Sequence, residues 1–332
     1  MRLYKKIFYD IIKYQSINQR RKVCISDMKN CDIHIRDPFV IFENGRYYMY
    51  GTRGENYGIC VGGFDVYESS DLVCWSEPRQ CFDSAKFNMN TGANWAPEVH
   101  KYNGKYYMLA SFPTKNEMFG TYILKSDSPL GPFEPLTGDA ITPHGQSCID
   151  GTLFVQDDIP YIFYSHDWPD NYVADEGAYV GEICAAQLSA DLTQIVGEPW
   201  VIFASNESPI SKATPDHNVL DGQNCVRYGS DAPFVQKLAD GSLLLTWSPY
   251  LNDNYVVLSA VSQNGNIKGP WKHTTEMLFD KDGGHAMFFD THDGKRCMCL
   301  HSPEQKMLER AHFFEVKEID GTLRVIKELE AQ

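Results

Sequence analysis

Residues 37–50 read Asp37-Pro-Phe-Val-Ile-Phe-Glu-Asn-Gly-Arg-Tyr-Tyr-Met-Tyr50 and decide the fold. Two apolar runs flank the turn Asn44-Gly45, whose residues accept the positive φ angles of a tight hairpin turn. Aromatic and β-branched residues, which favour strands, dominate both runs. The stretch therefore predicts a β-hairpin.

This hairpin pattern returns four times along the chain. The later turns are Asn103-Gly104, Asp157-Asp158, Asp240-Gly241 and Asp293-Gly294. A second strand-turn-strand phrase follows each hairpin, as in residues 69–78 and 265–271. Units recur at roughly 50–60 residues, with one longer interval, which is typical of propeller blades. The sequence predicts an all-β fold, a five-bladed β-propeller with four antiparallel strands per blade.

The repeat also predicts the domain organisation. Each blade buries its faces only against its neighbours, so the five blades form one unit. We expect an N-terminal extension over residues 1–30 and a single propeller over residues 31–332. The longer interval, between the third and fourth blades, reads as a long loop, and such loops are usually functional.

The net charge, the apolar stretches and the cysteines of the chain exclude several kinds of partner and predict its localisation. A formal net charge of −14 over 332 residues argues against nucleic acid and anionic membranes as partners, and favours a neutral substrate. Polar residues interrupt the N-terminal apolar stretch, and no run is long enough to span a bilayer. Ten cysteines are scattered singly, so we expect a cytoplasmic protein without a signal peptide. No motif predicts an organic cofactor, and no feature indicates an oligomeric state.

The first residues of the five blades include most of the candidate catalytic residues. The first strand of a blade lines the central channel, and these strands begin at Asp37, Ala96, Asp150, Asp231 and His285. Burying unpaired charge is costly, so three acids at matching positions favour a functional site. The structural alternative is that each Asp bonds turn backbone. Crowded carboxylates acquire divergent pKa values, as glycoside hydrolysis requires.

These first residues lie in motifs that together resemble glycoside hydrolase family 43, whose members include arabinanases, α-L-arabinofuranosidases and β-xylosidases. The resemblance runs from about residue 32 onward. The motifs are Arg36-Asp37-Pro38, Asn94-Trp95-Ala96-Pro97-Glu98, Ile149-Asp150-Gly151, Ser230-Asp231-Ala232-Pro233-Phe234 and Gly283-Gly284-His285.

The resemblance implies an inverting glycoside hydrolase acting on arabinose- or xylose-containing oligo- and polysaccharides. It implies that Asp37 is the general base and Asp150 the pKa modulator. We expect an exo mode, because the long insert could close one end of the cleft. The residues expected to bind substrate are Arg36, Trp95, Glu98 and His166.

Two features of the fourth and fifth blades qualify this assignment. The family has a Glu as general acid in the fourth blade, whereas this chain has Asp231, whose oxygens reach roughly 1.3–1.5 Å less far. Glu182 and Glu176 are alternative acids, and a catalytically weakened carbohydrate-binding propeller is the alternative function. His285 corresponds to a family position that faces a cation, typically calcium, on the propeller axis.

Overall fold

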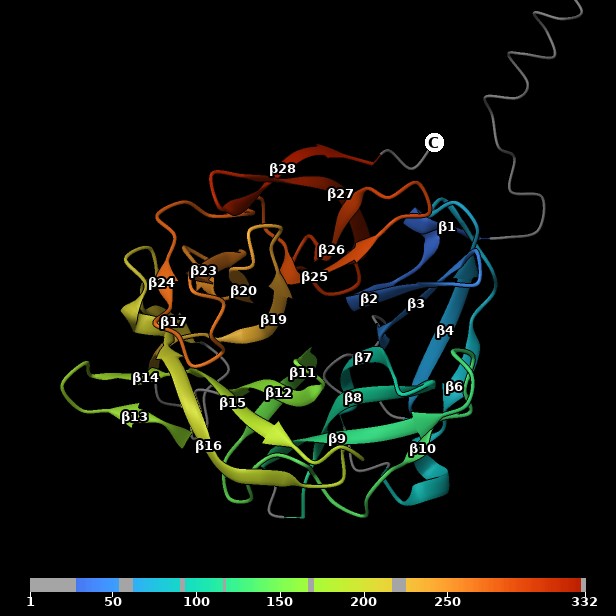
Figure 1. The fold of residues 1–332 in the computed structure, drawn as a ribbon, viewed down its shortest axis with the longest axis horizontal. Coiled ribbons are helices and arrows are strands. Elements are labelled where there is room, and N and C mark those ends of the chain that lie inside the picture. Colours follow the sequence, from blue (N-terminus) through green and yellow to red (C-terminus); the bar gives the residue numbers. More distant parts are fainter. Residues whose placement is uncertain are drawn as a thin grey trace, which may run out of the picture.

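The structure, a computed structural model, describes residues 28–53, 62–89, 93–115, 118–166, 170–216 and 225–329. Within these ranges five antiparallel sheets surround a common centre, each adjacent to the next along the chain (Figure 1). The strands nearest the centre are β2 in blade 1 and the first strand of each of the other four blades. The predicted five-bladed β-propeller is confirmed.

The blades follow the chain in order. Blade 1 contains β1 (Met28–Lys29), β2 (Ile35–Glu43), β3 (Arg46–Arg53), β4 (Phe64–Ser69), β5 (Cys74–Trp75) and β6 (Arg79–Phe82). Blade 2 contains β7 (Trp95–Tyr102), β8 (Lys105–Pro113), β9 (Phe119–Ser126) and β10 (Glu134–Pro135). Blade 3 contains β11 (Cys148–Gln156), β12 (Ile159–His166), β15 (Glu182–Leu188) and β16 (Ile195–Ala204).

The remaining blades complete the circle. Blade 4 contains β19 (Asp231–Lys237), β20 (Leu243–Ser248), β23 (Leu258–Ser262) and β24 (Lys272–His273). Blade 5 contains β25 (Gly284–Asp290), β26 (Arg296–Ser302), β27 (Arg310–Ile319) and β28 (Thr322–Glu328). Short 3₁₀ helices span Asn30–Asp32, Ser84–Phe87 and Ser205–Glu207.

The hairpin turns form as their residues predict. In the β2–β3 turn Asn44 and Gly45 have φ angles of 51° and 79°, and in the β7–β8 turn Asn103 and Gly104 have 47° and 75°. Positive φ at both central residues gives the turn a twist that matches the flanking strands. These short turns join the first two strands of blades 1 and 2.

The hydrophobic core is divided into five clusters, each between two neighbouring blades. One cluster lies between blades 1 and 2, one between blades 2 and 3, one between blades 3 and 4, and one between blades 4 and 5. The fifth cluster joins blade 5 to blade 1, where Trp75 stacks on Phe313 with ring centroids 6.1 Å apart. This last junction, which joins blade 5 to blade 1, is here called the seam; like the other junctions between the described sheets, it has no shared strand. Side-chain packing and a backbone hydrogen bond of 3.4 Å from Ile35 N to Glu309 O close the propeller there.

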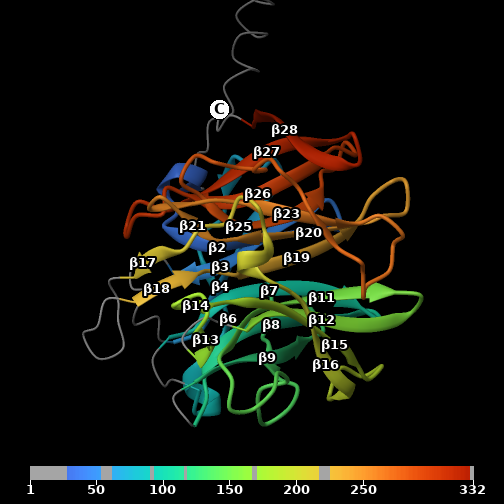
Figure 2. The same ribbon diagram turned by 90° about the vertical axis from the view of Figure 1, so that its left-hand side faces the viewer.

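The insert between blades 3 and 4 is partly strand, which corrects the prediction of a long loop. Its strands β17 (Thr214–Asp216) and β18 (Cys225–Tyr228) form a separate sheet together with β13 (Tyr172–Val173) and β14 (Ala178–Val180), which belong to the connection between β12 and β15 of blade 3. β14 and β18 pair in parallel, which joins the insert to blade 3. This sheet and the hairpin β21 (Tyr250–Leu251)–β22 (Asn254–Tyr255) lie toward one face of the propeller (Figure 2).

The start of the described chain and its cysteines bear on the remaining predictions. Met28 and Lys29 pair with β5, so blade 1 includes residues just before the predicted boundary at residue 31. The predicted extension otherwise lies outside the described residues.

Buried free thiols include Cys148, Cys184, Cys297 and Cys299, whereas Cys74 is disulfide-bonded, which a reducing compartment does not favour. No described helix is long and apolar enough to cross a membrane.

Candidate active site

A β-bulge interrupts the innermost strand of every blade at the same place. The pairing of the first two strands shifts after Arg36, Trp95, Ile149, Asp231 and Gly284. The next residue in each blade has a positive φ between 49° and 56°, and these residues are Asp37, Ala96, Asp150, Ala232 and His285. Positive φ costs about 1–2 kcal/mol for a residue with a Cβ. Five such bulges at one level of the channel therefore indicate that a functional site lies at this level.

The backbone N–H groups at this level are held by the preceding blade. Thr52 Oγ1 accepts from Ala96 N at 2.8 Å, and Ser111 Oγ accepts from Asp150 N at 2.9 Å. Across the seam, His301 Nδ1 accepts from Asp37 N at 3.1 Å. Ser248 Oγ accepts similarly from His285 N at 2.9 Å. The strained backbone is thus fixed from blade to blade.

This register corrects the prediction that three aspartates occupy matching positions. Asp37 and Asp150 are equivalent, but their counterpart in blade 4 is Ala232. Asp231 lies one residue earlier, level with Arg36 and Trp95 at the strand start. The first residue of β19 was mistaken for the bulge residue because strand starts cannot be aligned to one residue from sequence. Asp231 therefore belongs to a different level of the channel from the other two acids.

Asp37 is an ionised carboxylate enclosed by donors. Its Oδ2 accepts from Thr52 Oγ1 at 2.6 Å, and its Oδ1 lies 3.1 Å from His285 Nδ1. Burial alone would raise the pKa of Asp37, but the charges of His285 and Arg36 outweigh burial and hold it far below the usual range. The group is therefore a carboxylate at every working pH.

Asp150 and Asp231 shift in the opposite direction. Burial raises the pKa of Asp150 to about 7, and the charges of Asp231 and Asp37 add to the rise while His285 opposes it. Burial also raises the pKa of Asp231, with Arg227 opposing and Glu304 contributing. The Asp150 carboxylate accepts from Ala232 N at 3.0 Å, which places it beside the Asp231 backbone. One channel thus contains both a carboxyl group whose pKa is held low and two carboxyl groups whose pKa values are raised.

Arg36 and Trp95, two predicted substrate-binding residues, lie level with Asp231. Arg36 Nη1 donates to Glu304 at 2.8 Å and to Glu309 at 3.2 Å. Trp95 is partly exposed and stacks on Phe119, with ring centroids 4.2 Å apart and planes 7° from parallel. A partly exposed, braced indole is a platform on which a sugar can stack.

Glu98 lies deeper than expected for a residue at the mouth. It follows the bulge in β7, is 3% exposed, and its Oε2 lies 3.1 Å from His100 Nε2. Its charge contributes to raising the pKa of His285. The structure thus places Glu98 inside the channel, with His285, rather than beside Trp95.

His166 is held between two carboxylates. Its Nδ1 lies 2.9 Å from Glu182 Oε2 and its Nε2 lies 3.2 Å from Asp170 Oδ1. Burial lowers the pKa of His166, but these two partners outweigh burial and raise it to about 9. The ligand atoms of His166, Glu182 and Cys184 lie within 4.8 Å of one another, close enough for a metal ion. The proton of the His166 imidazolium lies between His166 and Glu182, where a metal ion would have to bind.

The two alternative acids are placed differently from Asp231. Glu182 bonds to His166 and contacts none of the three aspartates among the described interactions. Glu176 is exposed, on the turn between β13 and β14. By contrast, no described residue hydrogen-bonds to the carboxyl group of Asp231. That leaves Asp231 available to a substrate.

His285 fits the cation that the family resemblance implies. Its Nδ1 faces Asp37, and its buried Nε2 has no hydrogen-bond partner among the described residues. Burial lowers the pKa of His285, but Asp37 and Asp150 raise it to about 9, so a cation would replace a proton there. One nitrogen near acidic groups suits calcium that is coordinated mainly by water.

Sequence reasoning missed Glu304, His301, Tyr250 and Arg227. Glu304 accepts from Tyr250 Oη at 3.0 Å, and the Arg227 guanidinium lies 5.0 Å above the Tyr250 ring. Alignment of the second strands would have found His301, because it occupies the position of Thr52 and its equivalents. Arg227 belongs to the insert sheet, for which no repeat exists.

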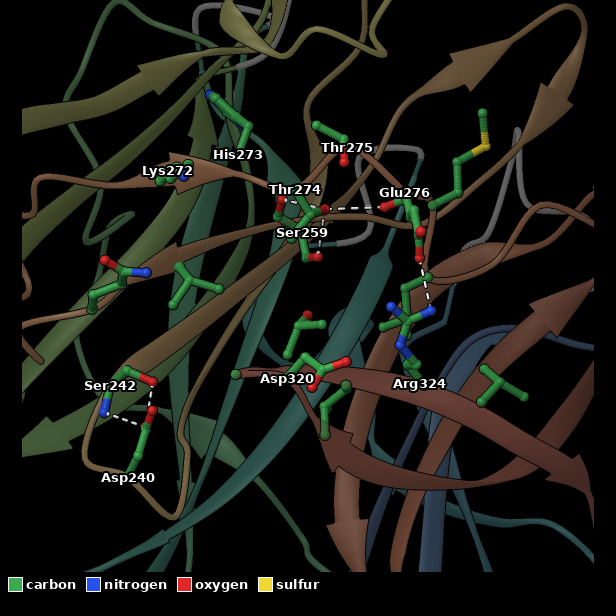
Figure 3. Close-up of a pocket in the computed structure, with 18 residues that line it drawn as sticks. Asp240, Ser242, Ser259, Lys272, His273, Thr274, Thr275, Glu276, Asp320 and Arg324 are labelled. Atoms are coloured by element: carbon green, nitrogen blue, oxygen red, sulfur yellow. Dashed lines mark hydrogen bonds and ion pairs between the residues drawn. The ribbon is translucent and has the colours of Figure 1, made fainter.

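Another cavity in the described part of the chain lies away from the channel. It has a volume of about 570 Å³ and opens between β24 and the turns after β19 and β27 (Figure 3). Lys272, Glu276 and Arg324 line it, and Arg324 bonds to Glu276 at its rim. We assign the site to the channel, because the acids with opposite pKa shifts lie there.

Comparisons with known proteins agree with this assignment. An endo-arabinase from Bacteroides thetaiotaomicron VPI-5482 has a similar structure, with 31% identity, a TM-score of 0.77, and coverage of 89% of this chain and 99% of that chain. A thermostable family-43 glycoside hydrolase gives 27% identity and a TM-score of 0.72, covering 88% and 92%. An arabinoxylan arabinofuranohydrolase from Bacillus subtilis (strain 168) is 26% identical over 231 residues, 59% of this chain and 44% of that protein.

The chain thus spans less than half the length of this curated relative. The family model "Glycosyl hydrolases family 43" matches residues 32–317, which include the innermost strand of all five blades and every carboxylate described above. Together with the propeller fold, this match shows that the chain belongs to glycosyl hydrolases family 43.

Proposed function

We propose that this protein is an inverting glycoside hydrolase acting on arabinose- or xylose-containing oligo- and polysaccharides. The observation that carries the proposal is the opposite shift of two acids in one channel. The pKa of Asp37 is held low by His285 and Arg36 against its burial, whereas burial raises the pKa of Asp231. A glycosidase needs one ionised and one protonated carboxyl group on either side of the scissile bond.

Each group has a defined role in this reaction. Asp37 takes a proton from a water molecule, which attacks the anomeric carbon from one face of the sugar. Asp231 gives its proton to the glycosidic oxygen as the bond between that oxygen and the anomeric carbon breaks. Asp150 is the proposed pKa modulator, and the charge interaction between Asp231 and Asp150 that raises the pKa of Asp150 supports this role. One displacement inverts the anomeric configuration.

Asp231 is the proposed acid despite its shorter side chain. Its position one residue before the bulge aligns it with Arg36 and Trp95, whereas Asp37 and Asp150 lie at the bulge itself. Glu182 is paired with His166, and Glu176 is exposed on a turn outside the channel. Trp95 and Arg36 form the proposed sugar subsite, with His166 at its edge.

The substrate class rests on relatives. The names of an endo-arabinase and an arabinoxylan arabinofuranohydrolase support an arabinose-containing glycan for this chain. The exo mode stays a prediction, and the described insert strands lie on the face of the propeller that bears β21. Release of single sugars from long arabinan would support an exo mode, and mid-chain cleavage would contradict it.

A cation at His285 would supply positive charge on the channel axis. We propose calcium, held by the unpartnered Nε2 of His285 and by water. Chain residues do the rest: Asp37 orients the imidazole through Nδ1, and Glu98 adds negative charge nearby.

The proposal is tested by hydrolysis of p-nitrophenyl α-L-arabinofuranoside, p-nitrophenyl β-D-xyloside and linear arabino-oligosaccharides. Wild type is compared with Asp37→Ala and Asp231→Ala. We expect wild-type hydrolysis of at least one substrate and its loss in Asp37→Ala. Sugar binding without hydrolysis of any substrate would overturn the proposal in favour of a carbohydrate-binding propeller.

A further inference from the structure

His301 replaces a hydroxyl residue at the seam. In four blades the second strand carries Thr or Ser opposite the residue before the bulge, namely Thr52, Ser111, Ser165 and Ser248. Blade 5 has His301 there. Because the N–H of Asp37 points at Nδ1 over 3.1 Å, Nδ1 must present its lone pair. The ring proton of His301 is then on Nε2.

Glu304 receives that proton's hydrogen bond. Its Oε2 lies 2.6 Å from His301 Nε2, and His301 is fully buried against Tyr255. A carboxylate opposite Nε2 stabilises the Nε2–H tautomer, in which Nδ1 can accept. The chain of contacts therefore runs from Glu304 through His301 to the backbone of Asp37.

The second oxygen of Glu304 faces the level of Asp231. Oε1 accepts from Arg36 Nη1 at 2.8 Å and from Tyr250 Oη at 3.0 Å. Arg36 is equivalent to Asp231 in the bulge register, and both Arg36 and Tyr250 are largely buried. One carboxylate thus contacts His301, which holds the Asp37 backbone across the seam, and Tyr250, which lies close enough to Asp231 to interact with its charge.

We propose that Glu304 is a positioning residue: through His301 it holds the backbone of Asp37, and through Arg36 and Tyr250 it orders the surroundings of Asp231. This inference rests on the proposed function for the roles of the two aspartates. Glu304 acts through other residues and takes no proton in the reaction. A displacement of about 1 Å at either acid would cost on the order of 10²-fold in rate.

The test variant is Glu304→Gln, which has nearly the same shape. A glutamine has one acceptor oxygen and one NH₂ donor, so it satisfies either His301 or the pair of Arg36 and Tyr250, but not both. We expect kcat to fall about 10- to 100-fold with KM changed less than about threefold. The control is Tyr47→Phe, which removes the seam bond between Tyr47 Oη and His292 far from the acids.

Two readouts separate positioning from stability. Tyr47→Phe should lower Tm while kcat stays at the wild-type value, because its seam bond does not reach the bulge level. If Tyr47→Phe lowers kcat as much as Glu304→Gln at a similar Tm, general seam stability explains the effect and the proposal fails. A wild-type kcat in folded Glu304→Gln also overturns it.

Nitrogen NMR of ¹⁵N-histidine-labelled protein tests the proposal without activity. The His301 signals, assigned by their loss in His301→Thr, should show the Nε2–H tautomer in wild type and a mixture in Glu304→Gln. An Nδ1–H tautomer in wild type overturns the inference even if the enzyme is active. If wild type hydrolyses nothing but shows the Nε2–H tautomer, the proposed function fails while the Glu304–His301 link stands.

A second variant covers the case in which Glu304→Gln does not fold. His301→Thr supplies the hydroxyl acceptor that Thr52 provides in blade 1, but it cannot bond to Glu304. We expect this variant to fold, and to lose kcat with little change in KM. A wild-type kcat in His301→Thr would overturn the proposal.

Discussion

Replacement of Asp231 by Asn separates acid catalysis from binding. Asparagine has the shape of aspartic acid but cannot release a proton, and no described residue hydrogen-bonds to the carboxyl group of Asp231. The fold should therefore be kept, with a change in unfolding free energy within about 1 kcal/mol. General acid catalysis contributes about 10²–10⁴-fold, or about 3–5 kcal/mol of transition-state stabilisation.

The size of this loss should depend on the leaving group. The sugar alkoxide released from an arabino-oligosaccharide needs a proton, so kcat/KM of Asp231→Asn should fall by the full factor of about 10²–10⁴. p-Nitrophenolate leaves without one, so the loss on the aryl glycoside should be at least about tenfold smaller.

The assay is kcat/KM of wild type, Asp231→Asn and Glu182→Gln on both substrates at one pH. Glu182→Gln should retain acid catalysis, because Glu182 is paired with His166 outside the reacting acids. Equal losses on the two substrates would refute the acid role of Asp231. A leaving-group-dependent loss in Glu182→Gln would move that role to Glu182.

Three further predictions concern the same channel. Hydrolysis should decline as the pH rises through the shared titration of Asp150 and Asp231, whose pKa values burial raises, because the acid then loses its proton; a rate profile from pH 4 to 9 that climbs throughout would contradict this. Asp150→Asn should be less active than wild type, but its free energy of unfolding at pH 8 should be higher by at most about 4 kcal/mol. The reason is that the pKa of Asp150 is about 7 in the folded state against about 3.9 in the unfolded state, so its ionisation destabilises the native wild type increasingly above about pH 4 and fully above pH 7. That gain should vanish near pH 4 in urea denaturation, and a gain that persists there would refute the electrostatic explanation. Calcium added after chelation should raise Tm in wild type but not in His285→Gln, as followed by calorimetry; an equal rise in both would exclude His285 as the site.

The fold was predictable because its signals are local and repeated. The turn Asn44-Gly45 and its four counterparts specify hairpins by backbone chemistry alone, and recurrence of the unit specifies the propeller. The insert was less predictable, since strands of two to four residues such as β17 and β18 have no period to read.

The site was predictable by composition but not by register. Asp37 and Asp150 stand in recognisable motifs, yet a bulge adds one residue to a strand without a sequence mark, so Asp231 was assigned to the wrong level. The role of Glu304 could not be predicted from the sequence for a different reason. It follows the second strand of blade 5 and meets Arg36 only when the circle closes, 268 positions away in sequence.

The central claim is that Asp37 and Asp231 together carry out a single displacement at the anomeric carbon. It is tested most directly by proton NMR of the sugar released in the first minutes of hydrolysis of a substrate that the wild type accepts. We expect the first product to have the anomeric configuration opposite to that of the substrate, followed by slow mutarotation. A first product that retains the substrate's configuration would require a covalent intermediate and would contradict the roles assigned to both aspartates.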